Sequence, residues 1–83
     1  MSFQSMDLTD RVRDLLAQAL QVPSEVVGAE LSFGDLPQWD SMGHMEVMVQ
    51  LEERFGVEIS ADTIAALTSV EAICAYLKEN GHA

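Results

Sequence analysis

The chain has 83 residues and a formal net charge of −10, and these two values exclude several kinds of protein. Its length allows one small domain but no deep, enclosed active site. Fourteen acidic residues against four basic ones repel phosphate backbones and anionic lipids, so neither nucleic acid nor a membrane is expected as a partner. An acidic surface instead favours proteins that present patches of Lys and Arg.

The residue types favour a small helical domain in a reducing compartment. Hydrophobic residues make up 48% of the chain, but only three Phe, one Trp and one Tyr are aromatic, which is typical of a helical bundle. The single cysteine, Cys74, allows neither an intramolecular disulfide nor a structural zinc cluster. No stretch approaches the roughly 18 apolar residues that a membrane span needs. We therefore expect a cytoplasmic monomer.

The first six residues show no periodic pattern, and helical spacing begins directly after them. We expect residues 1–6 to be a disordered extension, with either Met1 or Met6 as the true start. Apolar residues then recur in steps of three and four, which predicts an amphipathic helix over residues 8–20. Residues 7–81 are expected to form a single domain.

A long connection follows at residues 22–39, where both prolines and two glycines occur among scattered apolar residues. Loops of this length in compact domains are usually functional or held in place by their own apolar side chains. We predict an ordered loop that crosses the bundle with Phe33 and Leu36 buried.

Cap and stop signals define the second helix. Asp40 is a typical N-cap residue and Gly56 a typical stop, so a helix is predicted over residues 41–55.

Two further helices complete the predicted fold. A short third helix is expected around residues 62–66, with Ile64 and Leu67 facing inward. Thr68 and Glu71 match a capping box at the start of a fourth helix that ends near residues 80–81. The inward stripe of that helix is Val70, Ile73, Cys74 and Leu77. The predicted fold class is all-α: a small four-helix bundle with a short third helix and a long loop between the first and second helices.

The predicted second helix has two apolar faces, although a core requires only one. With about 3.6 residues per turn, one face carries Val47, Met48, Leu51 and Phe55, which suits the core. The opposite side carries Met42, Met45 and Val49 between the carboxylates of Glu46, Glu52 and Glu53. These six residues are either scattered surface positions or a docking stripe, in which adaptable Met side chains contact partners and carboxylates steer a basic surface.

A short motif stands at the start of this helix. It consists of Trp39, Asp40, Ser41 and Met42, followed by Glu46 and by Leu-Glu-Glu and Phe-Gly-Val at 51–53 and 55–57. The motif resembles the modification site and second helix of acyl and peptidyl carrier proteins. Residues 26–36 are similar to the first loop of that family, so the resemblance covers roughly residues 8–80.

The resemblance implies that the chain is a stand-alone carrier and not an enzyme. A phosphopantetheinyl transferase would move 4′-phosphopantetheine from coenzyme A to Ser41, and the arm would then carry acyl or aminoacyl intermediates as thioesters. An adenylating ligase or an acyltransferase would load the arm, and downstream biosynthetic enzymes would use its cargo. The catalytic base and metal ion would belong to the transferase, so this chain is expected to contain no metal site.

The physical demands of the site agree with this assignment, because a hydroxyl in the first turn of a helix is exposed. A phosphodiester there would lie near free N–H groups and the positive end of the helix dipole. Asp40 would cap the helix and, by resemblance, belong to the patch that positions the transferase. Met42 would touch partner enzymes, and Glu46 and Glu53 match recognition carboxylates. Each of these residues has the alternative of an ordinary solvated surface position.

The motif departs from fatty-acid carriers at Gly43, where an acidic residue is usual, and at Arg54 in an acidic helix end. Residues 40–43 are more similar to stand-alone aminoacyl carriers, including D-alanyl carriers, and to carriers of specialised pathways. The cargo stays open between an amino acid, a polyketide unit and an acyl chain.

Two other functions compete with the carrier hypothesis. The first is a small acidic adaptor that binds basic-faced partners and is never modified. The second is an esterase that uses Ser41 and His44, which the helical position of His44 disfavours because it faces the core. A His packed at the mouth of the bundle, or a pH-sensitive contact near the arm, fits His44 better.

Overall fold

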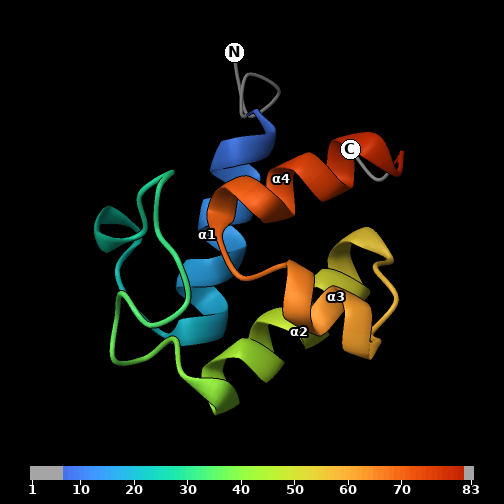
Figure 1. The fold of residues 1–83 in the computed structure, drawn as a ribbon. Helices are drawn as coiled ribbons and strands as arrows, with labels where there is room; N and C mark the ends of the chain where they lie inside the picture. Colours follow the sequence, from blue (N-terminus) through green and yellow to red (C-terminus); the bar gives the residue numbers. More distant parts are fainter. Residues whose placement is uncertain (1–6, 82–83) are drawn as a thin grey trace.

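The computed structural model describes residues 7–81, which fold into four α-helices and one short 3-10 turn (Figure 1). In chain order these are α1 (Leu8–Leu20), η2 (Ser24–Val26), α2 (Ser41–Phe55), α3 (Ala61–Ala66) and α4 (Val70–Glu79). The predicted all-α fold, the short third helix and the long first loop are confirmed. The disorder predicted for residues 1–6 concerns a segment outside the described residues.

The helices pack around α1, which contacts both α2 and α4, while α3 packs against α2. In Figure 1, α4 crosses α1 near the top of the view, and α2 lies below with α3 beside it. The loop between α1 and α2 occupies the side of the view opposite α3. The first turns of α2 follow this loop directly and contact α3, because His44 Nε2 lies 2.8 Å from the Ile64 carbonyl oxygen.

The ends of α2 follow the sequence signals. The Asp40 carboxylate accepts a hydrogen bond from the Gly43 N–H at 2.9 Å, which satisfies one of the free donors in the first turn. Gly56 ends the helix in the left-handed region, with a φ of 73°.

The start of α4 differs from the prediction. The predicted capping box of Thr68 and Glu71 is wrong, because Ser69 is the N-cap and its hydroxyl accepts from the Ala72 N–H at 3.0 Å. Both hydroxyl residues match the spacing of a cap, but Ser69 is the one that adopts the extended backbone that precedes the helix. A reciprocal capping box is present instead at the start of α3.

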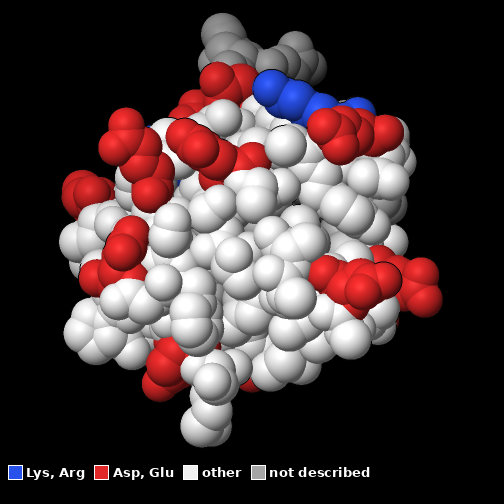
Figure 2. Space-filling view, viewed as in Figure 1, with Lys and Arg blue, Asp and Glu red and all other residues white. Residues whose placement is uncertain are grey.

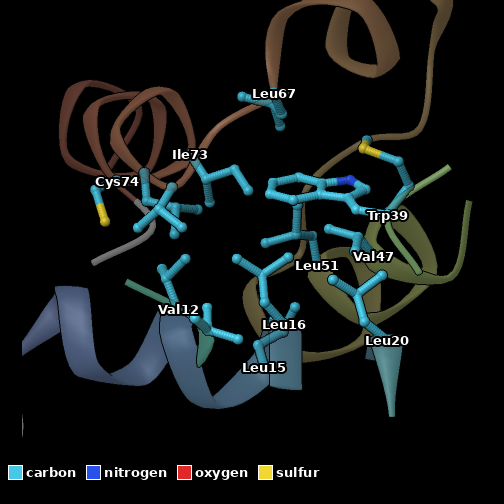
Figure 3. Close-up of a cluster of buried hydrophobic side chains, with 14 of the residues drawn as sticks. Val12, Leu15, Leu16, Leu20, Trp39, Val47, Leu51, Leu67, Ile73 and Cys74 are labelled. Atoms are coloured by element: carbon cyan, nitrogen blue, oxygen red, sulfur yellow. The ribbon is translucent and has the colours of Figure 1, made fainter. Parts of the chain in front are cut away.

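The core lies between α1, α2 and α4, and the indole of Trp39 reaches into it from the end of the long loop (Figure 3). The predicted burial of Phe33 is wrong, since this side chain is 43% exposed, and Leu36 is only half-buried. The loop is anchored by Val27 and Trp39, both fully buried. An indole buries a large apolar area, and its N–H needs a partner once buried, so it occupies the core only where a partner exists.

The predicted inner faces of the helices are confirmed at most positions. The buried side chains are Val47, Met48 and Leu51 on α2, Leu67 after α3, and Val70, Ile73, Cys74 and Leu77 on α4. Phe55 and Ile64 are half-buried against the edge of this core. The Arg11 guanidinium lies over the Phe55 ring, 4.9 Å from the ring centre, in a cation–π contact.

Hydrogen bonds hold the long loop in an ordered path, as predicted. The Arg13 guanidinium donates to the carbonyl of Val27 and, at 3.3 Å, to that of Ser24. The Val70 N–H donates to the Leu31 carbonyl at 3.0 Å, which joins the loop to the start of α4. None of the helices between residues 7 and 81 has the length and apolar character to cross a membrane.

Candidate functional site

Ser41 is the first residue of α2, and its side chain is exposed. The Asp40 cap fixes the helix start directly before it. The first N–H groups of a helix have no acceptor within the helix, and the helix dipole places positive potential there. A phosphate group on the Ser41 oxygen would meet favourable electrostatics at this position.

The six residues of the predicted docking stripe share the outward side of α2. Met42 is 80% exposed and Met45 42% exposed, while Val49 is only partly exposed. The three carboxylates of the stripe, on Glu46, Glu52 and Glu53, are all exposed. Large apolar side chains and negative charges therefore alternate on a surface that the core does not use.

Basic side chains in the described residues do not neutralise these carboxylates. Arg13 pairs with Asp10 at 3.5 Å, and Arg54 pairs with Asp14 of α1 at 3.6 Å. Arg54, which the sequence places in an acidic helix end, thus joins α2 to α1. Neither ion pair involves a carboxylate of α2, so the outward side of this helix keeps its negative potential.

His44 lies on the inner side of α2 and is only 5% exposed. The Trp39 indole N–H donates to His44 Nδ1 at 3.1 Å, and His44 Nε2 lies 2.8 Å from the carbonyl oxygen of Ile64. These partners require a neutral imidazole with its proton on Nε2, which donates to Ile64. Both ring nitrogens are thus engaged, and neither is available as a base for Ser41. The expectation of a packed His44 is confirmed.

Gly43 allows a close approach between the long loop and α2. A Cβ atom at this position would lie 2.1 Å from the Gln38 carbonyl oxygen and 3.0 Å from Leu20 Cδ2. The backbone just before Trp39 therefore rests directly on the first turn of α2. This contact explains why position 43 of this chain is a glycine.

An apolar groove of about 340 Å³ begins beside Ser41. It is lined by Phe33, Ser41, His44, Met45, Ile64 and Thr68. The ring of Phe33 meets that of His44 edge-on, with 5.7 Å between the ring centres. Figure 2 shows an uncharged area across the middle of this side of the molecule, with carboxylates around it.

A family model described as a phosphopantetheine attachment site matches residues 10–77. The chain belongs to the phosphopantetheine-binding carrier protein family. It is accordingly a carrier protein and not an enzyme. Its domain is the attachment site for phosphopantetheine.

Curated relatives agree with this assignment. The chain is 35% identical to acyl carrier protein 3 of Ralstonia nicotianae over 83% of its own length and 79% of the relative's. It is 32% identical to an acyl carrier protein of Bdellovibrio bacteriovorus over 94% of its length and all of the relative's. It is 28% identical to an acyl carrier protein of Thermobifida fusca over 95% of its length and all of the relative's.

Sequence reasoning missed the buried partnership of Trp39 with His44. Trp39 was considered only as part of the motif, and His44 was expected to be packed at the mouth of the bundle or to form a pH-sensitive contact, but neither was predicted to bind the other. Their spacing of five residues across the start of a helix is the one local signal, and it becomes informative only when the loop is known to turn inward at Gln38.

Proposed function

We propose that Ser41 is the residue that receives 4′-phosphopantetheine and that the arm carries acyl or aminoacyl groups as thioesters. The single observation that carries this proposal is the exposed Ser41 hydroxyl on the first turn of a capped helix, within the part of the chain that matches the attachment-site family. Asp40 supports the same proposal because it fixes the helix start, and it would face the transferase during the modification.

The outward stripe of α2 is the proposed docking surface for partner enzymes. Membership of the family implies a phosphopantetheinyl transferase and biosynthetic partners. We propose that an adenylating ligase or an acyltransferase loads the arm, and that Met42, Met45 and Val49 contact these proteins. Glu46, Glu52 and Glu53 would steer their basic surfaces.

We also propose that the carrier works as a cytoplasmic monomer. Only four large apolar side chains are exposed among the described residues. Met42 lies in the first turn of α2, and Phe33 and Met45 line the groove at Ser41. An apolar surface of this kind suits transient docking beside the arm more than a permanent oligomer.

The direct test is modification in vitro. The protein is incubated with coenzyme A, magnesium and a broad-specificity phosphopantetheinyl transferase, and the intact mass is measured. The expected result is one phosphopantetheine mass gain for the wild type and none for Ser41→Ala. Ser24→Ala is the matched control, because Ser24 is also exposed and lies at a helix start. An unmodified wild type would contradict the proposal and favour the adaptor, whereas a gain that Ser41→Ala retains would place the attachment on another residue.

A further inference from the structure

Three groups from different elements close the interior next to Ser41. The Trp39 indole, which is fully buried, donates to His44 on α2, and His44 donates to the Ile64 carbonyl on α3. We call Trp39, His44 and the Ile64 carbonyl the clasp. It ties the end of the long loop, α2 and α3 together through two hydrogen bonds.

The clasp forms the inner end of the groove that begins at Ser41. His44 and Ile64 line that groove, whereas the indole of Trp39 does not line it and lies in the core near Val47, Leu51 and Leu67 (Figure 3). A chain that passed from the groove into the core would have to separate His44 from one of its partners. This would leave a buried polar group without a hydrogen bond, which is unfavourable.

The loop backbone packs against α2 beside the clasp. Since Gly43 has no side chain, the Gln38 carbonyl, which directly precedes Trp39, can pack against α2. The indole and the neighbouring side chains of Val47, Leu51 and Leu67 are fully buried, and protein interiors are close-packed. A chain that entered the core would therefore have to displace these packed side chains as well as separate the clasp.

We infer that the clasp keeps the cargo of the arm out of the core, so that this carrier takes short apolar cargo, which rests in the outer groove. This inference rests on the proposed attachment at Ser41. Ser41 itself lines the groove, so a tethered group would be present there at high effective concentration. A volume of about 340 Å³ is at the lower end of small-molecule pockets, which span roughly 300–1,000 Å³.

The lining of the groove defines the class of cargo. Phe33, Met45 and Ile64 offer apolar contacts, and Thr68 adds a hydroxyl. His44 has no free nitrogen for a charged or strongly polar group. A short acyl chain or the small apolar side chain of an amino acid fits this chemistry, whereas a long fatty chain would extend beyond the groove into water.

A series of loaded carriers tests the inference. Acetyl-, butyryl-, octanoyl- and dodecanoyl-coenzyme A are used as donors for the transferase, and intact mass confirms each product. NMR spectra of each product are then compared. The chemical shifts of the Trp39 indole N–H and of the Val47 and Leu67 methyl groups report on the core, and those of Phe33 and Ile64 report on the groove. We expect the groove signals to shift between the acetyl and butyryl forms and to change little further with octanoyl and dodecanoyl. The core signals should keep the positions they have in the acetyl form throughout the series.

Core signals that shift progressively with octanoyl and dodecanoyl chains in the wild type would overturn the inference and leave the attachment proposal intact. No mass gain with any donor would overturn the attachment proposal itself, and this inference with it. The two failures are thus distinguishable in the same samples.

Two variants sharpen the test. Trp39→Phe keeps an aromatic ring but removes the indole donor, and we expect octanoyl to shift the Val47 and Leu67 signals in this variant only. If Trp39→Phe does not fold, the wild-type series alone decides. Phe33→Ala should reduce the shift of the Ile64 signal, whereas Val26→Ala should not, although Val26 is similarly exposed, at 44%, in the same connection between α1 and α2. Equal shifts of the Ile64 signal in both alanine variants would contradict a cargo in the groove.

Discussion

The inner and outer faces of α2 differ in what constrains each residue. On the inner face, Val47 and Leu51 are fully buried, and His44 has a fixed partner for each ring nitrogen. On the outer face, Met42 is 80% exposed, and no ion pair in the described residues involves a carboxylate of this helix. The comparison teaches that one side of this helix stabilises the fold, while the other side stays exposed and is the proposed docking surface.

The largest expected effect comes from the inner face. Leu51→Ala removes a fully buried side chain and should lower the free energy of unfolding by about 2–5 kcal/mol, a large part of the stability of so small a domain. Met42→Ala, on the same helix, should change it by no more than about 0.5 kcal/mol. Urea denaturation of both variants measures the difference. Equal effects would contradict the division into two faces.

The contact between the loop and α2 predicts an intermediate effect. Gly43→Ala places a Cβ 2.1 Å from the Gln38 carbonyl oxygen, and the resulting overpacking should cost about 1–3 kcal/mol. Gly28→Ala is the control, because a Cβ at Gly28 meets no atom within 4 Å. Thermal unfolding with tryptophan fluorescence follows the environment of Trp39 in both. If Gly43→Ala is as stable as Gly28→Ala, the loop does not rest on the helix as described.

The smallest effect on stability, but a clear one on recognition, is expected on the outer face. Replacing Glu46 and Glu53 with Gln should leave the free energy of unfolding within about 0.5 kcal/mol and lower kcat/KM of the transferase several-fold. Higher salt should reduce the difference between the wild type and the double variant, since the Debye length falls from about 10 Å at 0.1 M to 3 Å at 1 M. Glu79→Gln on α4 is the control for loss of charge elsewhere. If the double variant has the same kcat/KM as the wild type, these two carboxylates do not contribute to docking of the transferase.

The sequence predicted the helices well because burial repeats with the period of a helix. Leu15 and Leu16 on α1 and Ile73 and Leu77 on α4 are buried at the spacing that periodicity detects. The cap and stop of α2 were equally local signals. Ser41 was found through its motif, which depends on neighbours in the chain and not on tertiary packing.

The errors came from choices that only tertiary structure makes. Phe33 lies partly exposed beside the groove, whereas the Trp39 indole is fully buried, where His44 accepts its hydrogen bond. Thr68 and Ser69 both match a helix cap, but the Thr68 carbonyl accepts from the Phe33 N–H, and the extended residue before α4 is Ser69. The need for glycine at position 43 likewise depends on a carbonyl from another element.

The most direct test of the central claim is to locate the modification within the chain. After reaction with coenzyme A and the transferase, the protein is digested and its peptides are fragmented in a mass spectrometer. The account predicts phosphopantetheine on the peptide that contains Ser41, with fragments that assign it to that oxygen. Phosphopantetheine on another residue, or on none, would contradict it.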